Sequence, residues 1–308
     1  MTKTMSSVVG MIQTAAQTEH DPDTVARVAW ATVAVPGDEL VGALIADIGA
    51  ATALEAVFGE DPQPVEDLTV RRVRKRVGAL STGRVAFALR ASERQGLTVV
   101  TPLEYAWPTR LDRLGPAAPL VLWTRGRVSL LRRPNAAIIG DAPLSSRGLH
   151  ATLELASQLA VGGYVIASSA GPGVDTAALL ATVAVRQAPM AVVGTGIDDD
   201  GLGDDRRLAD RVAEAGVLVS EVPPGAPPDE YAPARRCRVL AAATDRTIVV
   251  EAGARSEAVA TARFARDLGS PVGAVPGPVD MPWGAGATFL VEHEGASPVA
   301  TADDAAWM

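Results

Sequence analysis

Residues 165–183, VIASSAGPGVDTAALLATV, decide the fold class of this chain. An apolar run ends in Ser168 and Ser169, a glycine–proline–glycine turn follows, and Asp175 precedes a run rich in alanine and leucine. This order is typical of a buried strand that turns into a helix. Two interpretations of the turn stay open: a loop that holds a phosphate through its backbone and serine hydroxyls, or a plain connection in which Asp175 caps the helix.

The same alternation of strand and helix continues on both sides of this stretch. Strands are expected at GLTVVTPL, APLVLWTRG, AAIIG, YVIAS, MAVVGTG, VLVSE, RTIVVEA and PVGAVPG. From residue 135 on, amphipathic helices separate the strands, and these strands are too apolar to have a wet face. We therefore predict an α/β domain over residues 96–308, with a Rossmann-like, doubly wound and mostly parallel sheet.

The N-terminal third has a different rhythm. Residues 1–20 are polar and unpatterned and predict a flexible tail. Over residues 21–95 apolar residues recur three and four apart, which predicts a small all-helical domain of the SAM or helix-hairpin-helix kind, with a break at Pro36-Gly37.

Charge argues against a protein that is basic throughout. The formal net charge is −8, whereas domains dedicated to phosphate backbones more often carry a basic excess. The cations are almost all arginine and gather at residues 71–76, 125–133 and 235–238. These clusters are either a local basic strip or solvated helix faces.

Cysteine and histidine usage argues against metal chemistry. The single cysteine, Cys237, excludes an internal disulfide and a cysteine-based zinc cluster. His20, His150 and His293 show no ligand spacing, so we expect neither a metal nor a cofactor. No secretory signal and no apolar run of membrane-spanning length is visible, so we expect a cytoplasmic protein without membrane contact.

In a doubly wound sheet, ligands bind outside the carboxyl ends of the strands, where helix N-termini point N–H groups at an anion. The turns to consider are therefore residues 140–148, 168–175, 194–205, 220–238 and 251–257. None matches the G-x-G-x-x-G dinucleotide fingerprint or the glycine–lysine of a Walker loop.

Taken in order, these segments resemble the DNA processing protein A (DprA/Smf) family. The matching segments are VTPLEYAWPTRLDRLGPAAPLVLWTRG, AAIIGDAPLSSRG, VIASSAGPGVDTAA, GVLVSEVPPGAPP and RRCRVLAAATDRTIVVEAGARSEAVATARFARDLGSPVGAVPGPV. The resemblance covers most of the chain. It implies a homodimer that binds single-stranded DNA, loads a RecA-type recombinase on it and catalyses no reaction. Since the chain stops at Met308, we expect the winged-helix domain that many family members append to be absent.

The resemblance also implies which residues contact DNA phosphates. They are Gly140 and Ser145 in the first turn, Ser168 and Gly173 in the second, Arg236 and Arg238 in the fourth, and Arg255 and Ser256 in the fifth. A groove of N–H groups, serines and arginines tracks phosphates without reading base edges, so binding is sequence-tolerant and salt-dependent. Because residues two apart on a helix diverge by roughly 200°, at most one of the first two arginines faces the groove.

Several positions depart from the family's pattern, and four of them bear directly on DNA binding. Asp141 and Ala142 stand where a small residue and an arginine are expected, Cys237 replaces an asparagine, and Glu257 replaces a glycine. Two of the changes bring acid toward the site and one removes a cation. We therefore expect a weakened phosphate groove, or one reshaped for another ligand.

Three functions are compatible with these features. The leading one is a single-stranded-DNA-binding recombination accessory protein. The second is a degenerate relative that serves as a dimerising scaffold or senses a nucleotide-like ligand, which Asp141, Glu257 and the acidic run at 198–205 favour. The third, a phosphoribohydrolase, needs a proline–glycine–glycine loop and a catalytic glutamate that VVEAGARSEAVATA does not supply. A negatively charged or closed carboxyl edge would contradict the first function.

Overall fold

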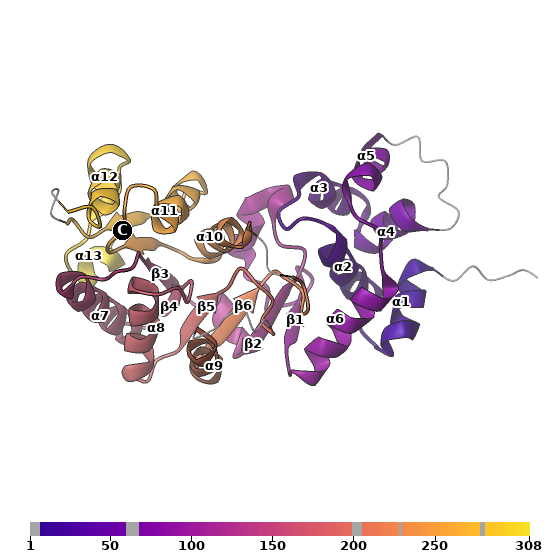
Figure 1. Ribbon diagram of the computed structural model, residues 1–308, viewed down its shortest axis with the longest axis horizontal. Helices are drawn as coiled ribbons and strands as arrows, with labels where there is room; N and C mark the ends of the chain where they lie inside the picture. The colour runs from indigo at the N-terminus through magenta and orange to yellow at the C-terminus, as the bar shows by residue number, and fades with distance from the viewer. Residues whose placement is uncertain (1–6, 60–67, 199–204, 228–229, 278–280) are drawn as a thin grey trace, which may run out of the picture.

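The computed structural model describes residues 7–59, 68–198, 205–227, 230–277 and 281–308. Within these ranges, six helices precede the sheet (Figure 1). They are α1 Val8–Ala16, α2 Pro22–Val33, α3 Glu39–Ile48, α4 Ala50–Phe58, α5 Leu68–Arg76 and α6 Thr82–Arg94. The expected all-helical N-terminal unit is therefore present, and it forms one end of an elongated molecule.

Helix α1 lies where a flexible tail was expected. The Ser7 hydroxyl caps it by accepting a hydrogen bond from the Gly10 N–H at 3.0 Å. Val8, Val9 and Ile12 are buried, and the helix packs against α6. The expectation is thus wrong from residue 8 to residue 16, because these apolar residues form a helical stripe too short to stand out among polar neighbours. Residues 1–6 lie outside the described ranges.

The break between α2 and α3 falls at Pro36-Gly37, as expected. The Asp38 carboxylate caps α3 by accepting from the Leu40 N–H at 3.0 Å. No single helix in the described part of the chain is long and apolar enough to cross a membrane. Helices α3 and α4 satisfy that test only when taken together, and they meet at 113°.

Nine strands form one sheet in the described residues. They are β1 Thr98–Val100, β2 Leu122–Gly126, β3 Asn135–Ile139, β4 Val165–Ser168, β5 Pro189–Val192, β6 Val217–Ser220, β7 Thr247–Val249, β8 Val272–Ala274 and β9 Ser297–Pro298. Their order is β1-β2-β6-β5-β4-β3-β7-β8-β9, and only the pairs β1–β2 and β2–β6 are antiparallel. The predicted Rossmann-like, mostly parallel sheet is confirmed.

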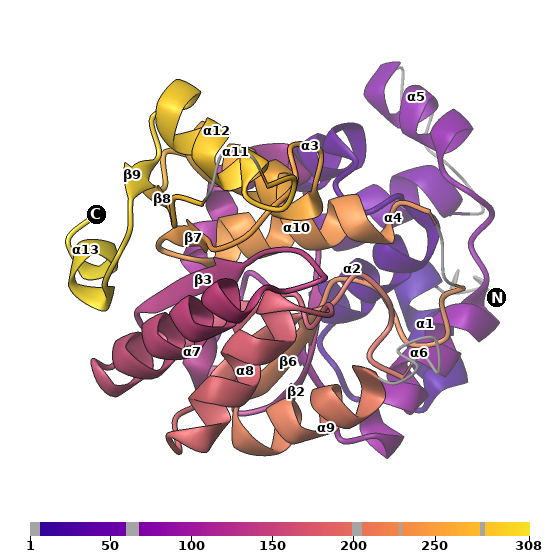
Figure 2. The ribbon, with the colours of Figure 1, turned by 60° about the vertical axis from the view of Figure 1, so that its left-hand side comes forward.

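Helices cover both faces of the sheet (Figure 2). They are α7 Ser146–Val161, α8 Val174–Ala184, α9 Asp205–Ala215, α10 Ala232–Ala243, α11 Glu257–Asp267, α12 Ala285–His293 and α13 Ala302–Ala306, with the short 3₁₀ segments η1 Thr109–Ala117 and η2 Val128–Arg132 before β3. Strand β3 serves both layers, since Ile138 packs with α7 and α8, and Ile139 with α10 and α11. Two-sided burial explains why its residues are uniformly apolar.

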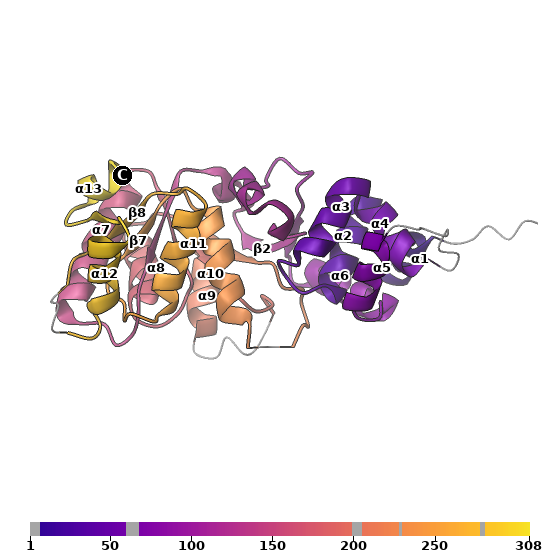
Figure 3. The ribbon, with the colours of Figure 1, turned by 90° about the horizontal axis from the view of Figure 1, so that it is seen from above.

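The helical unit shares a hydrophobic core with the near edge of the sheet. Trp123 on β2 is fully buried in that core, and its indole N–H donates to the Ser92 hydroxyl of α6 at 3.1 Å. Figure 3 shows the N-terminal helices packed beside β2. The unit is therefore a structural extension of the sheet domain.

The order of the strands reverses between β3 and β7. Strand β3 continues into α7 on one face of the sheet, whereas β7 continues into α11 on the other. Their carboxyl ends consequently leave a crevice, which is the usual ligand position in an open α/β sheet.

Candidate functional site

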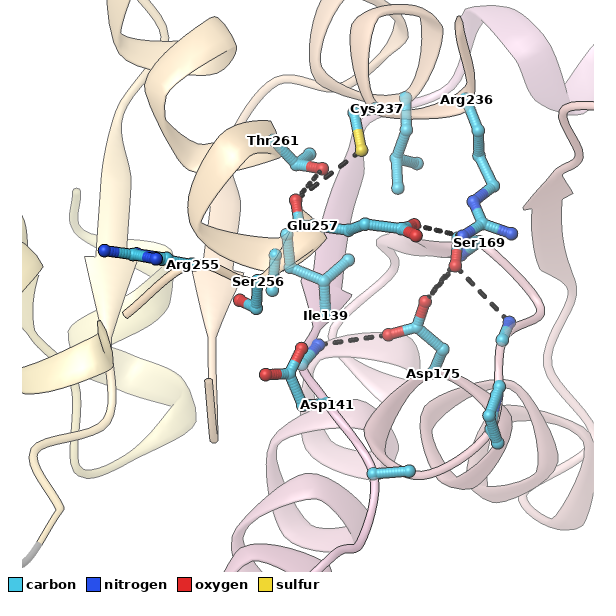
Figure 4. A pocket seen from close by; sticks show the side chains of 16 residues that line it. Ile139, Asp141, Ser169, Asp175, Arg236, Cys237, Arg255, Ser256, Glu257 and Thr261 are labelled. Atoms are coloured by element: carbon cyan, nitrogen blue, oxygen red, sulfur yellow. Dashed lines mark hydrogen bonds and ion pairs between the residues drawn. The ribbon is translucent and has the colours of Figure 1, made fainter. Parts of the chain in front are cut away.

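A cavity of about 430 Å³ opens at this crevice. The turns after β3, β4 and β7 line it together with helices α10 and α11 (Figure 4). The side chains that carry chemistry there are Asp141, Ser169, Asp175, Arg236, Cys237, Arg255, Ser256 and Glu257. Its volume is in the range of small-molecule sites.

The turn at 168–175 is an anion cradle that holds one of the protein's own carboxylates. Asp175 Oδ1 accepts from the Gly140 N–H at 3.0 Å, and Oδ2 accepts from the Ser169 N–H at 3.2 Å and from the Ser169 hydroxyl. The N-cap residue of α8 is Gly173, so Asp175 does not cap the helix. Of the two interpretations of this turn, the structure supports a cradle, but one occupied from within.

Burial changes the acidity of this internal carboxylate. The side chain is 5% exposed, and burial raises the pKa of Asp175 from 3.8 to about 6. The hydrogen bonds from Ser169 and Gly140 and the positive charge of Arg236 oppose that rise. At neutral pH the group is mostly ionised, so a phosphate entering the pocket would meet a buried negative charge.

The carboxylate of Asp141 is bonded to a further backbone donor. Its Oδ2 accepts from the Gly253 N–H at 2.8 Å, and its own N–H donates to the Glu251 carbonyl at 2.7 Å. Burial raises the pKa of Asp141 and the negative charge of Glu257 adds to the rise, while hydrogen bonds from Gly253 and Ser256 lower it. Backbone donors from three turns, at Gly140, Ser169 and Gly253, are therefore bonded to carboxylates of the same chain.

Helices α10 and α11 bring the remaining charges together. Arg236 lines the pocket but forms an ion pair with Glu257, one of the positions that depart from the family's pattern. Cys237 is buried beside them and its thiol donates to the Glu257 carbonyl at 3.5 Å. Burial raises the pKa of the Cys237 thiol, which keeps it protonated and unreactive.

Arg255 and Ser256 lie at the outer end of the pocket. The Ser256 hydroxyl caps α11 by accepting from the Val259 N–H at 3.2 Å. Arg255 is exposed and has no hydrogen-bond or ion-pair partner within the described ranges. Figure 4 shows its side chain directed away from Asp141 and Asp175. It is available to a ligand that lies on the edge of the sheet.

The structure places three of the expected phosphate contacts away from the pocket. Ser168 is completely buried and its hydroxyl donates to the Ile138 carbonyl at 2.8 Å. Ser145 caps α7, and its N–H donates to the Glu251 carboxylate at 2.9 Å. Arg238 forms a buried ion pair with Glu221. All three hold the fold together, and none of them lines the pocket.

Of the two expected glycines, Gly140 lines the pocket, whereas Gly173 packs behind it against the backbone of Asp141. Both serve close packing. A Cβ on Gly140 would come within 2.5 Å of the Glu251 carbonyl oxygen, and one on Gly173 within 2.2 Å of the Asp141 carbonyl oxygen. The divergence expected for Arg236 and Arg238 is confirmed, since only the former reaches the pocket.

Sequence reasoning missed the roles of Ser169, Asp175 and Glu251. The signal for Asp175 was its place in a glycine-rich turn after a buried strand, which fits an acceptor for loop N–H groups as well as a helix cap. Glu251 follows β7 directly, and a carboxylate at that edge can hold the turn after β3. From a single sequence, a polar side chain that bonds to a loop inside the protein cannot be distinguished from one that is exposed to water.

The ionisable side chains that line the pocket do not give it a positive charge. Among the described residues that line it, three are acidic (Asp141, Asp175 and Glu257) and two are arginines (Arg236 and Arg255). The pocket remains open, but its interior carries more acid than base. Within the described residues, no group of three or more histidine, cysteine or acidic side chains is arranged to hold a metal ion.

Comparison with known proteins places the chain among recombination proteins. The family model described as DNA recombination-mediator protein A matches residues 98–307. The putative DNA processing protein DprA of Mycobacterium tuberculosis is 36% identical over 233 residues, which cover 72% of this chain and 60% of that relative. The DNA processing protein DprA of Streptococcus pneumoniae is 32% identical over 187 residues, covering 61% of this chain and 66% of that protein.

Solved structures show the same architecture. The DNA processing protein A of Streptococcus pneumoniae matches with a TM-score of 0.73 and 25% identity over 91% of this chain and 95% of that one. The fold of a Helicobacter pylori DNA processing protein A matches with a TM-score of 0.60 and 23% identity, covering 68% of this chain and 93% of that one. The strand order of the sheet, the family model over residues 98–307 and the 36% identity to a relative all agree. We conclude that this chain belongs to the DNA recombination-mediator protein A family.

Proposed function

We propose that the protein binds single-stranded DNA as a non-enzymatic accessory of recombination. The observation that carries the proposal is family membership over most of the sheet domain. The Helicobacter pylori structure is described for its single-stranded DNA binding mode, which supports this ligand class for the present chain. A RecA-type recombinase as partner, a homodimer as the acting form and a cytoplasmic location follow from the same family resemblance and belong to the proposal.

The strand is expected to lie on the carboxyl edge of the sheet, outside the acid-filled pocket. Arg255 after β7 and Arg147 in the first turn of α7 are both exposed there, and the Arg147 guanidinium donates to the Pro276 carbonyl at 3.3 Å. A carbonyl partner leaves the positive charge uncompensated. Two such guanidiniums on one rim can hold successive phosphates by charge-assisted hydrogen bonds.

A second candidate function follows from the pocket itself. Its carboxylates, Asp141 and Asp175, together with the hydroxyls of Ser169 and Ser256, suit a ligand that donates hydrogen bonds, such as the sugar of a nucleoside, better than a phosphate. This observation favours the sensor of a nucleotide-like ligand, with DNA binding weakened.

A binding assay with labelled DNA separates the two candidates. We expect single-stranded DNA to bind more tightly than duplex, and more weakly as salt is raised. Arg147→Ala plus Arg255→Ala should lower the single-strand affinity roughly tenfold or more, since each charge-assisted contact contributes about 1–3 kcal/mol.

The matched control for that double variant removes two exposed arginines from the opposite edge of the sheet. Arg133→Ala plus Arg186→Ala changes the net charge equally and should leave the affinity within about twofold of the wild type. Equal losses in both double variants would mean non-specific attraction. Binding of a nucleoside by a protein that does not bind single strands would establish the second function instead.

A further inference from the structure

A second cavity, of about 480 Å³, lies between the N-terminal helices and the loop that follows β6. We call it the α6 groove. Its walls are the end of α2, the first two turns of α6 and the proline-rich segment 222–227, with Arg235 from α10. Figure 2 shows the chain after β6 passing beside α6. Most of the lining is apolar, and its described residues include no carboxylate.

An aromatic ring forms one wall of the α6 groove. Phe87 keeps 44% of its surface exposed, although the rest of α6 contributes mainly buried apolar residues to the core. The ring lies against the backbone of Gly225, where an added Cβ would come within 2.5 Å of Phe87 Cε1. The Gly225 N–H donates to the Asp198 carboxylate at 3.2 Å, which fixes the loop beside the ring. The site is thus built before any ligand arrives.

The helix that carries Phe87 is basic. Over Thr82–Arg94, α6 contains three arginines, Arg84, Arg90 and Arg94, and one acidic residue, Glu93, in a chain whose net charge is −8. Arg84 and Arg94 are exposed, and at about 100° per residue they fall with Phe87 within roughly 80° of arc on α6. The Arg94 guanidinium lies 5.9 Å from the centre of the Phe87 ring. An aromatic face flanked by guanidiniums is the combination that single-strand-binding surfaces use.

We propose that the α6 groove binds an unpaired base of a DNA single strand, stacked on Phe87, with the adjoining phosphates at Arg84 and Arg94. The proposal rests on single-stranded DNA as the ligand of the protein. The loop after β6 leaves the same edge of the sheet as the turns after β3 and β7, because these strands are parallel. One strand can therefore pass from Arg255 along this edge to the groove.

The test uses fluorescence anisotropy of the full chain with two labelled strands of equal length, one of thymidines and one of abasic sites. Phe87→Ala should weaken binding of the thymidine strand roughly five- to hundredfold, the range of one base–aromatic stack. Binding of the abasic strand should change less than about twofold, because phosphate contacts are kept. Phe87→Tyr should restore the thymidine affinity. Circular dichroism of each variant checks the fold.

The matched control is Phe289→Ala, which removes an aromatic ring of 41% exposure from α12 at the far end of the sheet domain. It should leave both affinities unchanged. An unaltered thymidine affinity in Phe87→Ala, an equal loss on both strands, or failure of Phe87→Tyr to rescue would overturn the proposal. An apolar peptide as the true occupant would give the first of these results.

The outcomes also separate this proposal from the proposed function. Binding lost in Arg147→Ala plus Arg255→Ala but not in Phe87→Ala would refute the groove alone. Dependence on Phe87 without dependence on the edge arginines would support the groove and refute the edge. A wild-type chain that binds neither strand would refute both.

Discussion

The cavity at the crevice between β3 and β7, which we call the switch-point pocket, and the α6 groove differ little in size, at about 430 and 480 Å³, but they are opposite in chemistry. The pocket is polar, and its N–H donors are bonded to Asp141 and Asp175. The groove is apolar, and beside it stand Arg84, Phe87 and Arg94. The fold provides an anion cradle at the usual place, but this chain fills the cradle with its own acids. The surface that remains suited to a polyanion lies elsewhere on the same edge.

The largest expected difference is in the free energy of unfolding, when a glycine beside the pocket and a glycine of the groove are each replaced by alanine. Gly173 packs against the pocket residue Asp141: it has φ 84°, and an added Cβ would meet the backbone carbonyl of Asp141 at 2.2 Å. Gly225 has φ 77°, and the three atoms nearest to an added Cβ all belong to the ring of Phe87, the closest at 2.5 Å. We expect Gly173→Ala to lower the free energy of unfolding by about 3 kcal/mol or more, because a backbone carbonyl cannot move aside. Gly225→Ala should lower it by about 1–2 kcal/mol, mainly through left-handed strain, because the exposed Phe87 ring can move away from the added methyl group. Urea unfolding measures both. Equal losses would mean that the pocket is not the more rigid site.

The next largest effect should be the change of the unfolding free energy with pH, which arises from Asp175 in the pocket. The pKa of Asp175 is about 6 in the fold against 3.8 for the free side chain. Between these values the folded state keeps a proton that the unfolded chain releases, so stability falls as pH rises. Relative to Asp175→Asn, the wild type should lose roughly 2–3 kcal/mol of unfolding free energy between about pH 4 and pH 7. Parallel pH curves for the two proteins would contradict an ionised, buried Asp175.

Breaking the ion pair between Arg236 and Glu257 should have a smaller effect, and this effect is on the affinity for single-stranded DNA. Its partner Glu257 is half exposed, so the ion pair is weak. Glu257→Gln should free the guanidinium and raise single-strand affinity about three- to tenfold, which corresponds to roughly 1 kcal/mol. The control Glu214→Gln, an exposed glutamate on α9, removes the same charge away from both sites. An equal gain of affinity in the control would mean that the effect comes from the net charge of the protein and not from Arg236.

The sequence was sufficient to predict the architecture because the signal is repeated. Each buried strand from residue 135 on is followed by a helical period, and this alternation determines the parallel sheet and the edge on which ligands bind. Helix α1 was missed because one short stripe of apolar residues carries little periodic information. The strand order and the α6 groove were beyond reach, since Phe87 and Gly225 are far apart in sequence and meet only through tertiary packing.

The site could be predicted by position and not by role. Ser168 and Ser169 are adjacent, and the alternation of side chains along a strand points the first into the core and the second into the pocket. The sequence alone does not tell which of the two points inward. Arg236 and Arg238 were separated correctly by helix geometry. Whether a carboxylate near a loop repels a phosphate or replaces it depends on hydrogen bonds such as Gly140 to Asp175, and these appear only in three dimensions.

Photo-crosslinking with a strand that contains 5-iododeoxyuridine, followed by peptide mass spectrometry, tests most directly where the DNA lies. If the strand follows the open edge and places a base in the α6 groove, the main adduct forms on Phe87, and Phe87→Ala abolishes it while the strand still binds. Adducts confined to the switch-point pocket, at Ser169 or Cys237, with none on Phe87, would contradict this account.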